Sequence, residues 1–195
     1  MSVVTWPTLS WKPTTLYSIL NYLNTWTNKI ITLEDPIEYE MPGIQQSQIN
    51  YNKNYDYETG LKAILRHDPD IILVWETRSK ETADIAVNAA LTWHLVFTTL
   101  HTNSAIASIP RLLSMWVESY LLAPAIQLIL WQRLVRKVCP NCSSKRPATY
   151  AEQTEIEHTI NKLNDLNIPN IPAFDGSLIE SHGCTQCNET WYIWR

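Results

Sequence analysis

The chain has 195 residues, of which 45% are hydrophobic, so it is long enough to bury one sizeable core and to carry a small appended module. Its 15 basic and 19 acidic residues give a net charge of -4, which excludes a whole-chain electrostatic attraction to nucleic acid or to an anionic membrane. The longest apolar stretch, residues 120–131, is shorter than the roughly 20 residues that span a bilayer, and no signal peptide is visible, so we expect a cytoplasmic location and no transmembrane segment.

Strand and helix signals alternate over residues 1–138. In chain order the pattern predicts a strand at 1–5, a helix at 14–23, a strand at 29–33, a helix at 57–67, a strand at 70–76, a helix at 79–92, a strand at 94–99, a helix that Asn103 caps and that runs to about Met115, and a last helix at 118–134. Near-continuous apolar strands that alternate with helices are typical of a buried parallel sheet. The sequence therefore predicts an α/β fold with a mainly parallel sheet.

The loop after the first strand has the frame of a phosphate-binding motif. It reads Trp6-Pro-Thr-Leu-Ser-Trp-Lys-Pro13, which fits G-x-x-x-x-G-K-[ST] with tryptophan at both glycine positions. Such loops point consecutive backbone N–H groups at a phosphate, at the start of a helix whose dipole favours an anion. Lys12 is in place to reach that phosphate. However, Leu9 and Trp11 would occlude the cradle, and Pro13 lacks both the N–H and the hydroxyl that would meet Mg²⁺.

From Cys139 the character of the chain changes. Two C-x-x-C pairs, Cys139/Cys142 and Cys184/Cys187, flank a polar, proline-containing stretch. A C-x-x-C turn places two thiolates about one tetrahedral edge apart, so two turns complete a four-cysteine Zn²⁺ site. Two disulfides or idle thiols are the alternatives, and disulfides are rare in a chain without an export signal. We expect residues 139–195 to form a metal-binding module separate from a nucleotide-binding core at 1–138.

Six blocks of sequence follow one another in a fixed order. They are TLYSILNYLN, ITLEDPIEYEMPGIQQSQIN, LKAILRHDPDIILVWETR, ETADIAVNAALTWHLVFTTLHTN, YLLAPAIQLILWQRLVRKVCPNC and CTQCNETWYIWR. The blocks resemble those of the secretion-superfamily ATPases, and within them the type II secretion and type IV pilus assembly ATPases. The four cysteines favour this assembly and export branch, because the related pilus retraction ATPases lack the metal module. The resemblance implies a RecA-like P-loop NTPase core.

The resemblance also implies a site for ATP and Mg²⁺. It assigns the phosphate loop and its neighbour to the nucleotide, through Trp6, Ser10, Trp11, Lys12, Pro13 and Thr14. It matches Glu34, Asp35 and Glu38 to an acidic box, and Glu76 to the glutamate of an atypical Walker B segment. Because carboxylates at the carboxyl ends of parallel strands lie where such sheets bind ligands, we favour Glu76 for the metal and the attacking water, with Glu34 as the rival base.

Histidines and arginines complete the implied site. His94 and His101 match a histidine box, in which His101 is the better placed to sense the γ-phosphate. Arg66 and Arg78 resemble arginines that lie near the nucleotide or a subunit boundary, where a guanidinium neutralises phosphoryl charge. Each of these four residues also has a plain structural interpretation, as a core histidine or a surface ion-pair partner.

The function implied by the resemblance is that of an ATP-hydrolysing motor for type IV pilus assembly or type II secretion. It implies a homo-hexamer, peripheral to the inner membrane and docked on a membrane platform protein, with no direct contact to nucleic acid. The family has a further domain before the phosphate loop, so we expect the chain to be a fragment. Two alternatives stay open: a catalytically inactive zinc-binding fragment, because Trp6, Leu9, Trp11 and Pro13 break the phosphate loop, and a DNA-uptake ATPase of the same superfamily.

The nine Trp and four Gly are the least expected feature of the composition, since an average chain of this length carries about 14 glycines. In the blocks that the chain resembles, glycine stands at the positions of Trp6, Trp11, Trp75, Trp93, Trp116, Trp191 and Trp194, and it also fits at Trp26 and Trp131. One genetic cause covers all nine positions: some bacterial lineages translate the codon UGA as glycine, and reading it as Trp gives this pattern. Leu9 and Pro13 are not explained in this way.

Overall fold

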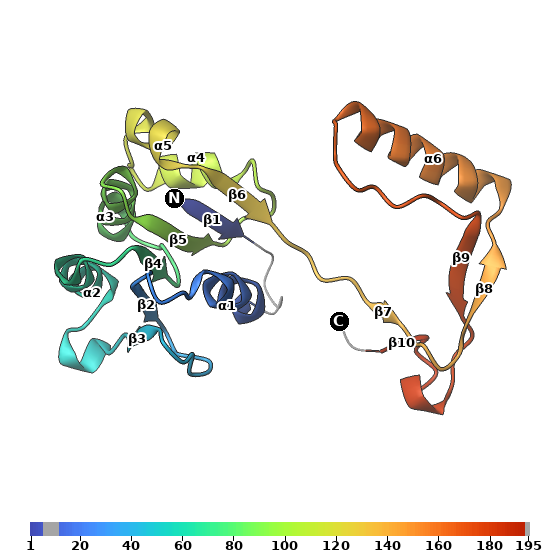
Figure 1. Cartoon of the computed structure of the whole chain (residues 1–195), viewed down its shortest axis with the longest axis horizontal. Coiled ribbons are helices and arrows are strands. Elements are labelled where there is room, and N and C mark those ends of the chain that lie inside the picture. The colour runs from blue at the N-terminus through green and yellow to red at the C-terminus, as the bar shows by residue number, and fades with distance from the viewer. Residues whose placement is uncertain (6–11, 194–195) are drawn as a thin grey trace. The chain divides into compact units, whose positions relative to one another are not determined.

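The computed structural model describes residues 1–5 and 12–193, and the chain divides into two compact units, Met1–Arg133 and Leu134–Arg195 (Figure 1). The phosphate-loop residues Trp6, Ser10 and Trp11 lie outside the described residues, as do the side chains of Lys12 and Pro13. Each unit is described by itself below.

The first unit is built on a six-stranded sheet. Its strand order is β3-β2-β4-β5-β1-β6, and every neighbouring pair is parallel. The strands are β1 (Ser2–Thr5), β2 (Ile30–Glu34), β3 (Gln45–Gln48), β4 (Ile71–Val74), β5 (Leu95–Leu100) and β6 (Leu128–Trp131). The expected α/β fold with a mainly parallel sheet is confirmed.

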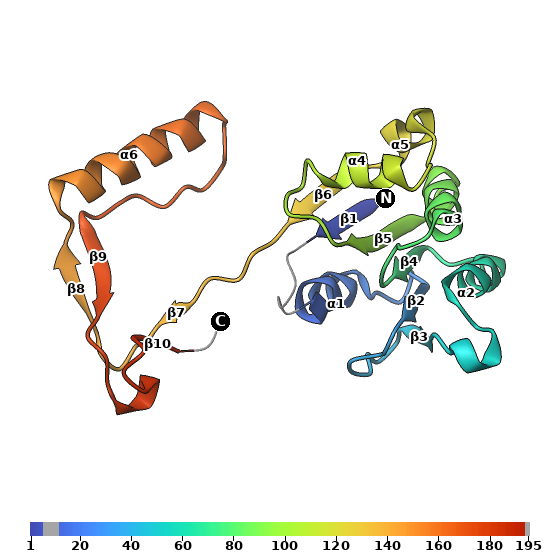
Figure 2. The same cartoon turned by 180° about the vertical axis from the view of Figure 1, so that it is seen from behind.

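Helices cover both faces of this sheet. One face packs against α1 (Lys12–Leu23), which buries Leu16, Tyr17 and Leu20. The other face packs against α2 (Tyr57–Ile64), α3 (Lys80–Leu91), α4 (Ser108–Ser114) and α5 (Ser119–Ala125). Figure 2 shows α2 and α3 side by side, with α1 apart from them on the other side of the strands. Each face thus has its own hydrophobic core, as a parallel sheet requires.

The alternation of side chains along β2 decides where its polar residues point. Ile31 and Leu33 belong to the core under α2 and α3, whereas Ile30 belongs to the core under α1. Because successive side chains of a strand point to opposite faces, Thr32 and Glu34 lie on the α1 face. Both are fully buried. This register brings a carboxylate under the helix that begins at Lys12.

Two expectations for residues 100–134 are wrong. The helix expected at 118–134 ends at Ala125, and residues 128–131 instead form β6, which pairs with β1. A backbone ladder with β1 is available to this apolar segment, and Pro124 already weakens a continued helix. Asn103 caps no helix: α4 begins at Ser108, and the Ser104 hydroxyl accepts the N–H of Ala107.

The remaining elements of the first unit are short. Two 3₁₀ turns, η1 (Tyr51–Lys53) and η2 (Leu65–His67), flank α2. The strand β3 was not expected, because its sequence Gln-Gln-Ser-Gln has no apolar alternation, and it lies at the edge of the sheet. Among the described residues, no helix is both long and apolar enough to cross a lipid bilayer.

The second unit has little core of its own. It contains two antiparallel strand pairs, β7 (Lys137–Val138) with β10 (Tyr192–Ile193) and β8 (Ser143–Pro147) with β9 (Ser177–Ser181), besides α6 (Tyr150–Asp165) and the 3₁₀ turn η3 (Thr185–Cys187). Of its residues that the structure describes, only Cys139 and Cys187 are buried. Apolar burial therefore does not explain how this unit is held together.

Candidate active site and metal centre

Polar side chains gather at the edge of the sheet where the parallel strands end. Glu34 is the last residue of β2, Glu76 follows β4 by two residues, and His101 directly follows β5. At the same edge, β1 ends and leads to α1, which begins at Lys12. Ligands of open α/β sheets bind outside the carboxyl ends of the strands, so this edge is the candidate active site.

Glu76 is held between an arginine and a histidine. Its side chain is only 11% exposed, Arg78 Nη2 lies 2.6 Å from Oε2, and His101 Nε2 lies 3.2 Å from Oε1. The hydrogen bond to Glu76 raises the pKa of Arg78 above its ordinary value. A neighbouring guanidinium favours the charged form of a carboxyl group. Glu76 therefore presents an oriented carboxylate at this edge, and Arg78, with a side chain that is 72% exposed, carries a positive charge beside it.

Glu34 is a carboxylate of a different kind, because it is fully buried and enclosed by donors. The Tyr17 hydroxyl donates to its Oε2. The Thr32 hydroxyl donates to Oε1 at 2.5 Å, and the Gln46 amide donates to the same oxygen at 3.0 Å. Burial, followed by the hydrogen bond to Glu34, raises the pKa of Tyr17, so the phenol keeps its proton and remains a donor. Three side chains thus fix the orientation of this carboxylate.

Sequence reasoning missed Tyr17, Thr32 and Gln46. Thr32 alone carried a usable signal, since it stands two residues before Glu34 and therefore on the same face of the strand. Tyr17 and Gln46 come from α1 and β3, and nothing in their spacing relates them to Glu34.

The other expected acidic-box residues lie near Glu34 but are exposed. Asp35 follows β2 directly, and the Tyr51 hydroxyl lies 3.5 Å from its Oδ2. The backbone N–H of Glu38 donates to the Tyr17 hydroxyl at 3.5 Å. Thr14 is exposed in the first turn of α1, and its carbonyl accepts from Ser18. These residues are placed at the edge of the site, not in its buried part.

The structure does not bring His94 and Arg66 to this edge. His94 stands immediately before β5, and its Nδ1 lies 3.0 Å from the carbonyl of Ala89 at the end of α3. Arg66 lies in η2, ahead of β4. Both positions are at the amino edge of the strands, whereas Glu34, Glu76 and His101 are at the carboxyl edge. We therefore leave His94 and Arg66 out of the proposed site.

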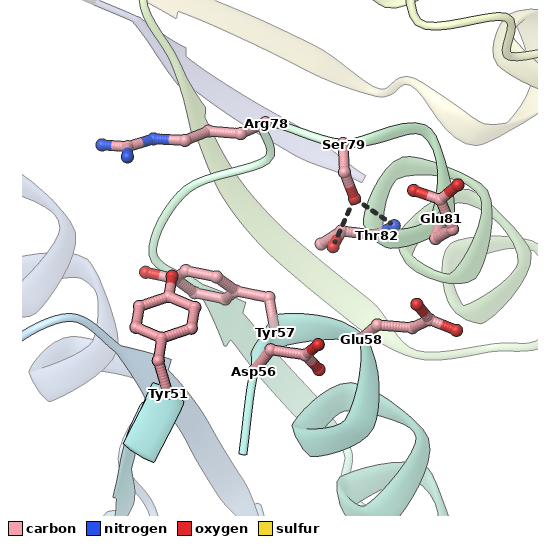
Figure 3. Close-up of a pocket in the computed structure, with 8 residues that line it drawn as sticks. All are labelled: Tyr51, Asp56, Tyr57, Glu58, Arg78, Ser79, Glu81 and Thr82. Carbon is pink, nitrogen blue, oxygen red and sulfur yellow. Dashed lines mark hydrogen bonds between the residues drawn. The ribbon is translucent and has the colours of Figure 1, made fainter. Parts of the chain in front are cut away.

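A pocket of about 320 Å³ opens beside Arg78, between the starts of α2 and α3 (Figure 3). Two aromatic rings and several polar residues line it, namely Tyr51, Asp56, Tyr57, Glu58, Arg78, Ser79, Glu81 and Thr82. Asp56 and Ser79 are engaged as helix caps, since each accepts a backbone N–H of the helix that follows. Arg78 lines this pocket and also contacts Glu76, but Glu76 itself is not among the lining residues.

The four cysteines of the second unit converge on one point. Their sulfur atoms all lie within 4.8 Å of one another. Three of the pairs, Cys139/Cys184, Cys142/Cys187 and Cys184/Cys187, are separated by 3.9, 3.8 and 3.8 Å. These distances exceed the roughly 2.05 Å of a disulfide bond. They match the edge of about 3.8 Å that four sulfurs make around a tetrahedral metal ion with bonds of about 2.3 Å.

The surroundings of Cys184 favour its thiolate, whereas burial raises the pKa of Cys139. The backbone N–H of Cys187 donates to the Cys184 sulfur and lowers the pKa of that thiol to about 6. A thiolate is the form of cysteine that binds metals. The donor set, the distances and the backbone hydrogen bond together suit a tetrahedral ion with soft ligands.

Comparisons with known proteins agree with this geometry. The family model described as "Type II/IV secretion system protein" matches residues 1–195. The chain is 44% identical to type II secretion system protein E of Aeromonas hydrophila over 190 residues, and 42% identical to the type IV pilus assembly ATPase PilB of Myxococcus xanthus over 192 residues. The two matches include 97% and 98% of this chain, but only 36% and 32% of the length of the two relatives.

A solved structure is similar as well. The pilus retraction motor PilT with bound ADP matches with a TM-score of 0.64 and 34% sequence identity, over 85% of this chain and 52% of that one. The likeness supports the α/β architecture and its relation to nucleotide-binding motors. The chain spans about a third of the length of the curated relatives that it matches.

Proposed function

Because the chain belongs to the type II/IV secretion system protein family, we propose that it is the RecA-like motor core of an ATPase that powers type IV pilus assembly or type II protein secretion. The observation that carries the proposal is the pair of oriented carboxylates, Glu34 and Glu76, at the edge of the sheet where the helix after the phosphate loop begins. Two such carboxylates at this edge are what a Mg²⁺-dependent phosphoryl transfer needs.

The residues have distinct roles in this proposal. Lys12 and the loop before it bind the phosphates of ATP once the loop carries the glycines of its motif. When bound, Mg²⁺ supplies charge neutralisation for the transferred phosphoryl group, with Glu76 as the residue that holds it through water. His101 and Arg78 orient the Glu76 carboxylate, and Arg78 adds positive charge near the transferred group. Glu34 is the second candidate for the base that orients the attacking water.

The assembly in this proposal is a homo-hexamer on the cytoplasmic face of the inner membrane, docked on a platform protein. The support is the family membership and the names of the relatives, a type II secretion protein and a pilus assembly ATPase. The second unit carries one Zn²⁺ on Cys139, Cys142, Cys184 and Cys187, which the sulfur geometry fits.

Nucleotide binding tests this function directly. We would replace Trp6, Leu9 and Trp11 by glycine and make Pro13→Thr, which restores backbone donors and a hydroxyl around Lys12. Trp75 and Trp93 would be replaced by glycine as well, because the resembling blocks carry glycine there. Calorimetry should then detect binding of MgATP to the repaired chain and not to the chain as it stands. Lys12→Ala in the repaired chain should abolish binding, and Lys29→Ala is the matched control far from the loop. A repaired chain that binds no nucleotide would make a structural zinc-binding fragment the better description.

A further inference from the structure

Tryptophan occupies backbone positions of this protein that suit glycine. Trp93, Trp116 and Trp191 have φ values of 74°, 62° and 68°. In this left-handed region the Cβ atom of an L-residue is crowded, whereas glycine enters it freely. The residues that tolerate it best after glycine are Asn and Asp, and those account for five of the other six described non-glycine residues with positive φ, the sixth being Glu189.

Trp93 stands at the end of α3 in the place of a glycine cap. The C-cap is Thr92, so Trp93 is the next residue, and the N–H of His94 donates back to the carbonyl of Ala89 at 3.3 Å. This bond from the second residue after the cap to the last turn of the helix defines a Schellman ending, in which the left-handed residue is most often glycine.

Trp116 occupies the equivalent position after α4, where the other bond of a Schellman ending is present. It follows the C-cap Met115, and its N–H donates to the carbonyl of Leu113 at 2.9 Å. The next residue, Val117, is buried in the same hydrophobic core as Leu112, which is the apolar pairing that accompanies a Schellman ending. Two unrelated helices therefore end on tryptophan where their geometry suits glycine.

The exposure of these side chains points the same way. Trp93 is 99% exposed, Trp116 is 77% exposed and Trp26, in the loop after α1, is fully exposed. Tryptophan is highly buried on average in folded proteins. These three do not form one docking surface, because α1 covers one face of the sheet while α3 and α4 cover the other. None of these three indoles is therefore packed in a hydrophobic core, and the three do not lie on one face of the sheet.

We infer that the protein made in the cell carries glycine at the nine tryptophan positions, because its gene encodes them with UGA and its organism reads UGA as glycine. This restores ordinary helix endings at 93 and 116 and brings the glycine count from four to thirteen, close to the roughly 14 expected for the length. It also places glycine at positions 6 and 11, so that the phosphate loop regains both glycines of its motif. The inference rests on the backbone geometry at residues 93, 116 and 191 and on the shortage of glycine in the whole chain, and it does not depend on the proposed function.

The gene sequence and the protein isolated from its own cells test this inference. All nine codons should be UGA in the gene, and tandem mass spectrometry of the protein purified from its own cells should find glycine at 93, 116 and 191. UGG codons at these positions, or tryptophan in the native peptides, would overturn it. Both readouts stay decisive if the protein binds no ATP, so failure of the motor proposal is distinguishable from failure of this one.

A stability measurement tests the geometry separately. In recombinant chain with tryptophan encoded by UGG, Trp93→Gly should raise the folding equilibrium constant about fivefold or more over Trp93→Ala, because alanine keeps the crowded Cβ. Trp75→Gly is the contrasting control: Trp75 is buried with its ring 5.7 Å from that of Tyr17, so its removal should lower the constant. Alanine equal to or better than glycine at 93 would show that the position does not need glycine.

Discussion

The Tyr17 hydroxyl donates a hydrogen bond to the Glu34 carboxylate, and both side chains are buried between α1 and the sheet. The bond joins the helix that begins at Lys12 to the strand that ends in the acidic box. A displacement of α1 when phosphate binds at its start would therefore change the position of the Glu34 carboxylate. The bond is also one of the three that side chains donate to this buried carboxylate, which gives the first prediction.

Tyr17→Phe should destabilise the first unit by about 1–3 kcal/mol, because a buried carboxylate loses one of its three side-chain donors while the ring packing remains. The measurement is urea denaturation at neutral pH. Tyr39→Phe is the matched control: the Tyr39 ring contacts that of Tyr17 edge-on at 4.5 Å, but Tyr39 is half exposed, so its loss of a hydroxyl should cost less than about 0.5 kcal/mol. Equal effects of the two variants would contradict the assigned role of the bond.

Glu76→Gln should leave ATP binding largely intact and lower turnover by about a hundredfold or more, because the amide keeps the size of the side chain but cannot accept a proton or hold Mg²⁺ as a carboxylate does. We would measure it in the glycine-repaired chain joined to the preceding domain of a close relative, because the proposed motor acts as a hexamer. His94→Gln, at the opposite edge of the sheet, is the control and should keep most of the activity. Full turnover in Glu76→Gln would move the catalytic role to Glu34.

Removal of the metal should unfold the second unit before the first, because the only buried residues described in residues 134–193 are two of the proposed ligands. Elemental analysis of refolded protein should find one zinc per chain, and a chelator should abolish the strand and helix signals of this unit alone. Cys142→Ser should act like the chelator, while Ser143→Ala, next to it and outside the ligand set, should not. A chain free of zinc that keeps this unit folded would refute the site.

The start of α6 should respond to acid at an unusually low pH. Arg146 donates to both carboxylate oxygens of Glu152, which lowers the pKa of that side chain from 4.5 to about 2. Since the folded pKa is depressed, the stabilisation is complete above about pH 4.5 and is lost as the pH falls toward 2.

An NMR titration of the Glu152 carboxyl tests the acid response. Arg146→Gln should raise the midpoint toward 4.5. Lys145→Gln, which removes an exposed contact to Asp175 at 3.2 Å, should leave it in place. A midpoint near 4.5 in the unmodified chain would show that the guanidinium does not hold the carboxylate in solution.

Much of the fold was predictable because four apolar runs, at residues 1–5, 29–33, 70–76 and 94–99, are too continuous for a surface element and suit a sheet covered on both faces. The polar strand β3 and the short strand β6 were not. The first lacks a hydrophobic pattern, and the second reads equally well as the end of a helix until β1 offers it a partner.

The candidate site divides in the same way. Glu34 and Glu76 were expected to meet because parallel strands end at one edge of a sheet, and His101 was expected there through the histidine box that it resembles. Tyr17 and Gln46 escaped notice, since their approach to Glu34 depends on how α1 and β3 pack, not on spacing along the chain. His94 was assigned to the site only through the histidine box that it resembles, although its place at the start of a strand puts it at the opposite edge of the sheet. The catalytic roles of all these residues stay predictions.

The β8–β9 hairpin beside the cysteine cluster affects which changes of chain length this protein tolerates. β8 and β9 are paired from Ser143 and Ser181 to Pro147 and Ser177, so the ends of residues 148–176 are held side by side. The entropy of closing such a loop changes only slowly with its length. We expect relatives to differ by insertions and deletions in residues 148–176. A fluorescent protein inserted in this segment should leave the six-stranded sheet of the first unit folded, so that it can be used to follow the location of the protein.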